Sequence, residues 1–414
     1  MTVKPLQRIT FLQKVRRFFL ILCGTYFLFL VLLTVPFVQR QFVYAHNVKV
    51  PIVSQYGLPE KYYLAPFKTH NVHINTYDNE TIGAWFTLAD PFYVSHKADL
   101  LSPNSSSEEL IRSALRDHPT ILFLHGITTT RTLGSRVQYY QAFSARLRAN
   151  VLAPDYRGFG DSTGTPSEDG LTLDARAAWD WLRERGTLPE NILIVGNSLG
   201  TGVAVNLASV LDREDERGGK EWHGIARREQ PRGVVLLSPF SNIETLLDTF
   251  FFMRVVPLFV PLRPFPYISK FAKRFLIDRF DTIAKVVGLK VPLLIVHAED
   301  DWDIPYSHSQ ALFDAFLEQH LPPLTEMTTA MASASDEVAE GVTKLSQERA
   351  ALRRELVTAG EIERLGRVEV FSKDRSDRKV VFIQTRWGGH YTVGLLEGVQ
   401  DYIAEMFDMG LIIH

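Results

Sequence analysis

A five-residue turn limits the folds open to this chain more than any other feature. It is Gly196-Asn197-Ser198-Leu199-Gly200, which follows the apolar run 191–195 and precedes the small-residue stretch 201–205. This order predicts a strand, a sharp turn and a helix, because a side chain at either glycine position would collide with its neighbours. The turn leaves Ser198 in a strained conformation, with its hydroxyl exposed beside the positive end of the helix.

A serine held in this way can attack an acyl carbon, so Gly196 and Gly200 are candidates for the glycines of a nucleophile elbow. The same five-residue pattern also occurs by chance in glycine-containing turns. The rest of the chain must therefore supply a base, an acid and donors for an oxyanion.

Apolar runs recur along the chain and alternate with helical patterns. The runs are 121–124, 151–153, 233–237, 292–296 and 380–384. Between them, 138–147 and 171–185 show the periodicity of amphipathic helices. Strands that are apolar throughout are covered on both faces, so the pattern predicts an α/β fold with a mostly parallel, doubly wound sheet. A hairpin over 71–90 is expected to precede it.

Two further stretches interrupt this order. The segment 250–267, inside an expected cap insertion over about 244–285, is rich in Phe, Val, Leu and Pro. It either packs on the core as a lid helix, or receives an acyl chain or touches a bilayer. The segment 324–364 is rich in Ala, Glu and Arg, which predicts a helical or partly disordered surface insertion. The polar stretch 100–117 is expected to be another surface insertion.

The N-terminal part holds an apolar run from Phe18 to Val38 without a charge. As a helix it would be ~31 Å long, which matches a hydrocarbon core of ~30 Å. Basic residues precede it and fewer follow, so the positive-inside rule places 1–17 in the cytosol and the remainder across the membrane. A cleaved signal peptide is the alternative, but the run is longer than a signal core of ~7–15 residues. We expect a signal anchor over 18–38, a linker over 39–70 and one globular domain over 71–414.

Charge and cysteine content narrow the classes of partner. Without the five basic residues before Phe18, 40 basic residues face 47 acidic ones, a net charge of −7. A mildly acidic domain argues against nucleic acid as a partner. Cys23 is the single cysteine, which excludes an intrachain disulfide. Glycosylation sequons begin at Asn79 and Asn104, both on the expected lumenal side.

An attacking serine needs an acid and a base, which in this architecture follow it in the order Ser, Asp or Glu, His. The acidic segment 297–303 comes directly after the apolar run 292–296. Carboxylates there would lie at the carboxyl end of a strand, where ligands bind in open α/β sheets. Three compete for the role of acid: Asp300, Asp301 and Asp303. The alternative for each of them is solvated surface.

The candidate base is His390, which follows the last apolar run and a pair of glycines. Those glycines allow the loop to bend into a site, and the other histidine after this run, His414, ends the chain. An oxyanion needs backbone donors. We expect one from the N–H of Leu199, the residue after the serine, and one from Ile127, in the loop after the run 121–124. The side chain of His125 is expected to be structural.

Four segments then resemble those of a known family, in the same order. They are Asp155 to Glu168, Gly196 to Ala204, Ser238 to Ile243 and Pro292 to Asp301. On these residues the chain resembles the alpha/beta hydrolase domain-containing protein 12 family, over roughly residues 70–400 with gaps at the insertions. The resemblance implies an alpha/beta-hydrolase fold and a single-pass membrane serine hydrolase with a lumenal domain. Family members cleave lysophosphatidylserine and monoacylglycerols.

Carried over by position, the resemblance implies Ser198 as nucleophile, Asp301 as acid and His390 as base. It selects Asp301 because the family aspartate is followed by two residues, an apolar residue and a proline, as here at 304–305. Asn197 stands where histidine is common, and we expect its side chain to point away from the chemistry.

The sequence thus predicts a membrane-anchored hydrolase of lysophospholipid or monoacylglycerol esters, which acts through an acyl-enzyme. Neither a metal nor an organic cofactor is required. The expected partners are a lipid ester and the bilayer, and no protein partner is indicated. The expected location is the endoplasmic reticulum, as a type II membrane protein. The alternatives are an acyl-protein thioesterase, a general carboxylesterase, or a catalytically silent hydrolase fold that only binds.

Overall fold

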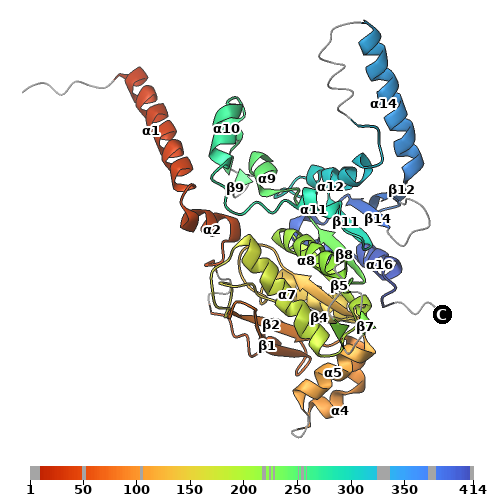
Figure 1. Ribbon diagram of the computed structural model, residues 1–414. Coiled ribbons are helices and arrows are strands. Elements are labelled where there is room, and N and C mark those ends of the chain that lie inside the picture. Colours follow the sequence, from red (N-terminus) through yellow and green to blue (C-terminus); the bar gives the residue numbers. More distant parts are fainter. Residues whose placement is uncertain are drawn as a thin grey trace, which may run out of the picture.

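The computed structural model describes residues 10–48, 53–102, 106–216, 221–222, 225–226, 229–249, 251–252, 256–257, 259–323, 336–371 and 379–410. Within these residues a ten-stranded sheet forms the centre of the molecule, and helices cover both of its faces (Figure 1). Two helices project away from this body: α1 near the N-terminus and α14 late in the chain.

The sheet has the strand order β1-β2-β4-β3-β5-β8-β11-β14-β13-β12. The six central strands pair in parallel, and the strand pairs at both edges are antiparallel. The bounds are β1 Thr69–Asn75, β2 Thr81–Thr87, β3 Thr120–Leu124, β4 Asn150–Pro154, β5 Ile192–Asn197, β8 Gly233–Leu237, β11 Leu293–Ala298, β12 Val357–Ile362, β13 Gly366–Phe371 and β14 Val380–Thr385. The predicted hairpin and mostly parallel sheet are confirmed.

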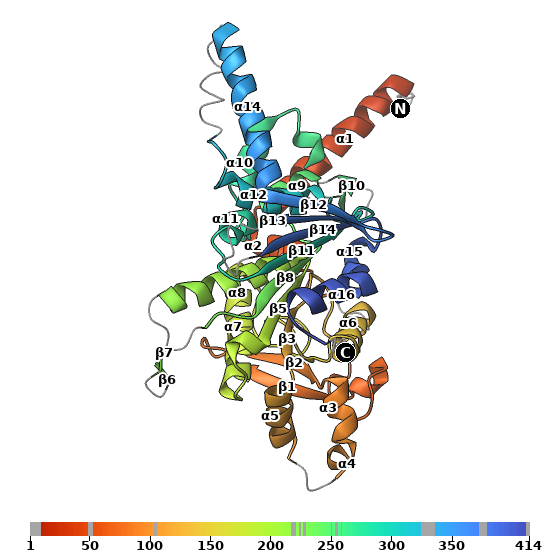
Figure 2. The same cartoon turned by 90° about the vertical axis from the view of Figure 1, so that its right-hand side faces the viewer.

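Successive strand residues pack into two separate cores, one on each face of the sheet. Leu122 and Ile194 face one core, whereas Phe123 and Val195 face the other. Figure 2 shows α7 and α8 on one side of the sheet and α6 and α16 on the other. The helices of this body are α3 Asp90–Ser95, α4 Lys97–Leu100, α5 Ser107–Asp117, α6 Gly134–Ala145, α7 Glu168–Glu184, α8 Leu199–Glu216, α11 Thr282–Val286, α12 Ser307–Glu318, α15 Gly389–Thr392 and α16 Glu397–Met406. Burial on both faces explains why the central strands are apolar throughout.

The N-terminal helices differ from the single helix expected over 18–38. Helix α1 runs over Phe11–Leu32, and a second helix, α2, runs over Pro36–Tyr44. Helix α1 begins before Phe18, at Phe11, because the side chain of Thr10 caps its first turn. It ends at Leu32, and Pro36, which has no N–H to donate to a preceding turn, begins α2 instead. Among the described residues, α1 is the one helix long and apolar enough to cross a membrane. The expected linker over 39–70 is also wrong, because it contains the end of α2 and the start of β1.

The segment between β8 and α11 forms a cap, residues 243–277. It contains α9 Ile243–Thr249, β9 Phe251–Phe252, β10 Val256–Pro257, the 3-10 turn η3 Val260–Leu262 and α10 Pro266–Lys273. Phe259 and Leu262 of the cap are buried in a small cluster of their own. This anchor–cap cluster also contains Tyr26, Phe29, Leu30 and Leu33 of the α1 segment, Phe42 of α2, and Leu247 and Ala272 of the cap. The cap therefore packs on the N-terminal helices.

Two expected surface insertions contain ordered elements. Helix α14, Asp336–Leu356, projects from the body, but β12 at 357–362 pairs with β13 at the sheet edge. The 324–364 stretch is therefore not purely an insertion, although residues 324–335 lie outside the described residues. In the stretch 100–117, α5 buries Ile111 and Leu115 in the core. Helix α5 looks polar in the sequence because it buries only one face, whereas the described side chains of α14 and β12 are exposed or half-buried.

Candidate active site

Ser198 lies between β5 and α8 in the conformation that the sequence predicts. Its φ is +53°, and its N–H donates to the carbonyl of Leu237 at 3.0 Å. A Cβ added to Gly196 would lie 2.4 Å from the carbonyl oxygen of Gly200, and one added to Gly200 would lie 2.0 Å from that of Leu124. Both glycines are therefore needed for this turn, which stores strain at the serine.

The structure brings Ser198, His390 and Asp301 together at the carboxyl edge of the sheet. They follow β5, β14 and β11, respectively. His390 Nε2 lies 2.8 Å from Ser198 Oγ, and its Nδ1 lies 2.8 Å from Asp301 Oδ2. The carboxylate only accepts, so Nδ1 carries the proton and Nε2 accepts from the serine hydroxyl. All three residues are buried.

The three competing aspartates have different surroundings. Asp301 contacts His390, whereas Asp300 Oδ1 accepts the N–H of Gly389 at 2.7 Å, directly before that histidine. Asp303 lines the cavity beside the serine. Asp300 thus holds the backbone of the histidine loop, and Asp301 holds its imidazole.

A second histidine contacts Asp301. His297 Nε2 lies 3.0 Å from Asp301 Oδ2 and 2.9 Å from the carbonyl of Ile304, while its Nδ1 lies 2.6 Å from Ser309 Oγ. Burial alone would raise the pKa of the Asp301 carboxyl, but hydrogen bonds from His297 and His390 outweigh it and hold the pKa well below its usual range. Asp301 is therefore ionised at neutral pH.

Ile127 lies in the loop 125–129, which follows β3 and runs beside the serine. A Cβ added to Gly126 would lie 3.0 Å from the Cβ of Ser198, so this glycine permits the close approach. Buried Arg136 donates from one Nη2 atom to the carbonyls of residues 126, 127 and 128, at 3.0, 3.0 and 2.7 Å. One guanidinium thus fixes three successive peptide groups of this loop.

The N-terminal segment holds the same loop from outside. Thr128 N–H donates to the carbonyl of Tyr44, and Thr129 N–H donates to that of Val48, both at 3.0 Å. Thr128 and Thr129 both have positive φ, 63° and 53°. The loop is therefore kept in an uncommon conformation by Arg136, which donates to it, and by the carbonyls of Tyr44 and Val48, which accept from it. The other expected oxyanion donor is the N–H of Leu199. Leu199 is the first residue of α8, and the first N–H groups of a helix have no carbonyl acceptor in a preceding turn.

The neighbours of the serine and of the loop have structural contacts. From the sequence, the Asn197 side chain is expected to point away from the chemistry. In the structure its Nδ2 atom lies 3.5 Å from the carbonyl of His390, so the side chain contacts the histidine loop. The ring of His125 is buried, with Nδ1 2.7 Å from the carbonyl of Gly126 and Nε2 3.2 Å from Asp155. Burial lowers the pKa of His125, which is therefore neutral, in keeping with a structural part.

Asp155 belongs to a charged network that explains one of the resembling segments. Buried Arg131 donates to Asp155 at 2.6 Å and to Asp161 at 2.7 Å. Arg157 donates to Asp78, in the β1–β2 turn, and to buried Asp174. These ion pairs join the hairpin to the central sheet. The charged residues of the segment 155–168 therefore stabilise the fold and lie outside the triad.

Ser198 opens into a cavity of about 710 Å³. Its lining is mostly apolar and includes Phe42, Val43, Ile127, Leu133, Leu199, Phe240, Ile243, Leu246, Leu247 and Ile304. The first two belong to α2, and four others belong to the cap or its approach. Sequence reasoning did not find α2 as a wall of the site, because no local pattern relates it to residues 150 or more positions away.

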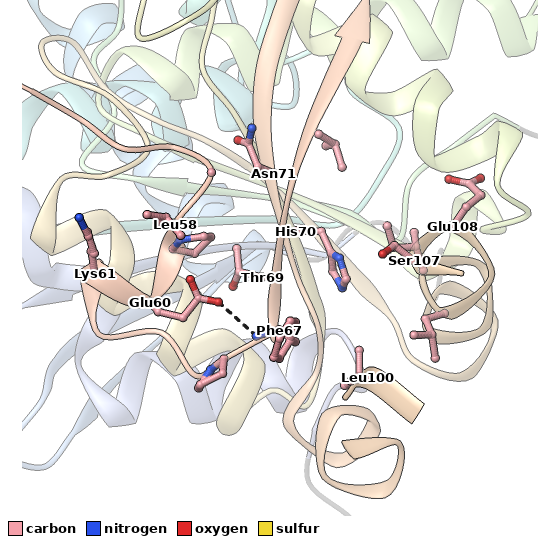
Figure 3. Close-up of a pocket in the computed structure, with 16 residues that line it drawn as sticks. Leu58, Glu60, Lys61, Phe67, Thr69, His70, Asn71, Leu100, Ser107 and Glu108 are labelled. Carbon is pink, nitrogen blue, oxygen red and sulfur yellow. Dashed lines mark hydrogen bonds between the residues drawn. The ribbon is translucent and has the colours of Figure 1, made fainter. Parts of the chain in front are cut away.

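A larger cavity of about 990 Å³ lies away from Ser198, beside the edge strand β1 (Figure 3). Side chains from η1 (Pro59–Tyr62), β1 and α5 surround it, including Glu60, His70 and Glu108. None of the residues predicted for catalysis lines it. The chemistry predicted from the sequence therefore belongs to the smaller, apolar cavity.

Two further predictions concern ligands and modification. Within the described chain, Asp301, Asp303 and His390 form a group whose donor atoms lie within 4.8 Å of one another and could hold a metal. Asp301 Oδ2 and His390 Nδ1 already bond to each other, so we assign these atoms to the triad. Asn79 is exposed in the β1–β2 turn and accessible to a glycan, whereas Asn104 lies outside the described residues.

Known proteins are similar to this chain in sequence and in fold. The model of the alpha/beta hydrolase family matches residues 121–370. Lysophosphatidylserine lipase ABHD12 of Danio rerio is 32% identical over 302 residues, which cover 73% of this chain and 72% of the relative. This chain belongs to the ABHD12 family of alpha/beta hydrolases. Protein ABHD12B of Homo sapiens is 34% identical over 283 residues, covering 66% of this chain and 68% of that protein.

An alpha-beta hydrolase from Vibrio vulnificus has the same fold as this ABHD12-family chain. The TM-score is 0.51 at 16% identity, with 90% of this chain and 94% of the other covered. The shared fold confirms the predicted alpha/beta-hydrolase fold. The family model and the lipase relatives confirm the predicted enzyme class, so the chain is a hydrolase. Arg136 and His297 were missed by sequence reasoning. The position of His297, directly before the acidic segment, was an available signal, but nothing in the sequence marks Arg136.

Proposed function

We propose that this chain is a membrane-anchored serine hydrolase that removes the acyl chain from lysophospholipids of the lysophosphatidylserine type or from monoacylglycerols. The observation that carries the proposal is the hydrogen-bonded series Ser198–His390–Asp301 at the wall of a cavity lined mostly by apolar side chains. Such a lining suits a fatty acyl chain, because each buried CH₂ group contributes about 0.8 kcal/mol. The name of the relative, lysophosphatidylserine lipase, supports the same substrate class.

In the first half of the reaction, Ser198 Oγ attacks the ester carbonyl while His390 Nε2 accepts the hydroxyl proton. The carbonyl oxygen becomes an oxyanion, which we assign to the N–H groups of Leu199 and Ile127. The C–O bond to the glycerol oxygen then breaks, and His390 returns its proton to that oxygen. The lysolipid head group leaves as an alcohol, and the fatty acid remains on Ser198 as an ester.

In the second half, His390 takes a proton from a water molecule, and the hydroxide attacks the acyl-enzyme carbonyl. The bond to Ser198 breaks, the serine regains the proton and the fatty acid is released. Asp301 keeps His390 in the tautomer with Nδ1 protonated and stabilises the imidazolium formed in each half. Its depressed pKa keeps it ionised throughout.

The proposal places the apolar part of α1, from Phe18 onward, across a membrane as a type II anchor. Residues 1–17, which include the first turns of α1, lie in the cytosol, and the hydrolase domain lies in the lumen of the endoplasmic reticulum. The length and composition of α1 support the span, and the five basic residues before Phe18, three of them in the first turns of α1, support the orientation. A glycosidase-sensitive shift in mass that disappears with Asn79→Gln or Asn104→Gln would support the lumenal location. Modification of engineered cysteines in the domain by a cytosolic reagent would contradict it.

The catalytic proposal is tested by labelling membranes that contain the full chain with a fluorophosphonate probe. We expect labelling of the native protein and none of Ser198→Ala. Competition by lysophosphatidylserine, monoacylglycerol and an acyl thioester then ranks the substrates. Stronger competition by the thioester would favour the thioesterase alternative, and no labelling of a folded native protein would leave only the silent binding fold.

A further inference from the structure

The cap turns its apolar side outward. Six large apolar side chains of the cap are exposed: Phe265, Tyr267, Ile268, Phe271, Phe275 and Ile277. Lys273, the last residue of α10, is buried, and its Nζ lies 2.6 Å from a carboxylate oxygen of Asp248 in α9. A helix in water normally has the opposite arrangement, with apolar residues inward and charges outward. The outer side of α10 is therefore built to meet something other than water.

The anchor–cap cluster shows what lies beside that surface. Phe259 and Leu262 of the cap pack against residues 26–33, the last two turns of the α1 segment. Figures 1 and 2 both place α10 on the side of the body from which α1 projects. At ~1.5 Å per residue the contact covers about 10 Å of α1. Amphipathic helices at membrane surfaces reach a similar depth of ~5–10 Å.

The same packing leads to the serine. Phe42 of α2 and Leu247 of α9 belong to the anchor–cap cluster and also line the cavity that holds Ser198. Gln39 of α2 donates to the carbonyl of Phe275 at 2.6 Å and accepts from the N–H of Ile277 at 3.1 Å. Thus one continuous wall joins the exposed side of the cap, the end of the anchor and the cavity.

We infer that the cap is a second membrane-binding element, which inserts its exposed aromatic and aliphatic side chains into the leaflet next to α1. The lipid ester then moves sideways from this leaflet into the Ser198 cavity, between α2 and α9, without passing through water. The occupant of the surface is a phospholipid bilayer, and exposed Lys270 and Arg274 supply positive charge for its phosphates. This inference rests on the proposed membrane span and ester hydrolysis.

Penetration is tested on the full chain in phosphatidylcholine–phosphatidylserine vesicles. A bimane fluorophore is attached at Tyr267→Cys or, as the control, at Val94→Cys, both with Cys23→Ser. Val94 is also exposed, on α3. We expect lipids spin-labelled on the acyl chain to quench the fluorophore at 267 and not at 94. Quenching at 267 by aqueous iodide alone, or by neither quencher, would overturn the inference, and the second result would indicate a protein on this surface.

Activity gives an independent test. The variant Tyr267→Ser/Ile268→Ser/Phe271→Ser is compared with the matched control Tyr63→Ser/Val94→Ser/Leu101→Ser, whose side chains are equally exposed. We expect the cap variant to lose about tenfold in kcat/KM on lysolipid in vesicles, because less apolar surface enters the leaflet. Its hydrolysis of a soluble butyrate ester and its fluorophosphonate labelling should not change. Equal activity of the two variants on vesicles would overturn the inference. If the native chain itself did not hydrolyse the soluble ester, the proposed function would be contradicted instead.

Discussion

Arg136 offers the sharpest test of how the site is held together. Its guanidinium is buried, and one nitrogen donates to three successive carbonyls of the loop that runs beside Ser198. Burial lowers the pKa of Arg136, because the buried guanidinium loses its hydration. The hydrogen bonds to these carbonyls partly replace the lost bonds to water. Without that donor, the loop that carries Ile127 loses its inner support.

We expect Arg136→Met to reduce kcat by about 10² to 10³, the cost of removing one oxyanion donor. Arg136 is part of the wall of the Ser198 cavity, but its hydrogen bonds go to the carbonyls of the loop, so we attribute the loss to movement of the Ile127 N–H. Each buried carbonyl that loses its partner costs about 1–3 kcal/mol. Since the three share one donor and the loop can relax, we expect a loss of stability of about 3 kcal/mol and not the full sum.

Arg232 provides a matched control, because it also donates to three backbone carbonyls, of residues 190, 407 and 408. It lies just before β8, at the opposite edge of the sheet from Ser198. Arg232→Met should lower the melting temperature and leave kcat nearly unchanged. The assay measures kcat and KM on a soluble ester, with the melting temperature of each variant. A folded Arg136→Met enzyme with native kcat, or an equal loss of kcat in Arg232→Met, would refute the reasoning.

Three further outcomes are expected. Gly200→Ala places a Cβ 2.0 Å from a backbone oxygen and should destabilise the domain by ~3 kcal/mol or more in thermal denaturation, whereas Gly134→Ala, with open space around it, should have little effect. His297→Phe should lower kcat about tenfold, because Asp301 loses one of the two histidine side chains that hold its carboxylate in place; a folded variant with native kcat would contradict this. Burial lowers the pKa of His308 to about 4, so the unfolded chain, with an ordinary pKa of ~6.5, binds the proton first as pH falls. Stability should therefore drop by up to about 3 kcal/mol between pH 6.5 and 4, and the drop should shrink in His308→Gln.

The central part of the fold was predictable because its strands are buried on both faces. The apolar runs 121–124, 233–237 and 380–384 correspond to β3, β8 and β14 almost residue for residue. Strand β13, at 366–371, was not found because its charges pair inside the protein. Glu369 in this strand is buried and bonds to two arginines, so the segment resembles solvated surface in the sequence.

The candidate site also contains residues that the sequence predicts and residues that it does not. Glycine geometry and chain order suffice to bring Ser198, Asp301 and His390 forward, and the structure places them in hydrogen-bond contact. Their catalytic roles stay a prediction until the serine is labelled. Arg136 and Phe42 could not be found, because each reaches the site through packing of distant segments, which leaves no local periodicity.

The two bonds from the loop 125–129 to Tyr44 and Val48 bear on how this enzyme can be prepared. Deleting the N-terminal helices to obtain a soluble form would remove the Tyr44 acceptor and, with α2, part of the cavity wall, and it would leave the Val48 acceptor on a free chain end. Such a truncated protein could keep its sheet and still report a misleading rate constant. Purification of the full chain in detergent or nanodiscs is therefore the sounder route to its kinetics, and inhibitors selected against a truncated form would be fitted to a binding site that the complete enzyme does not have.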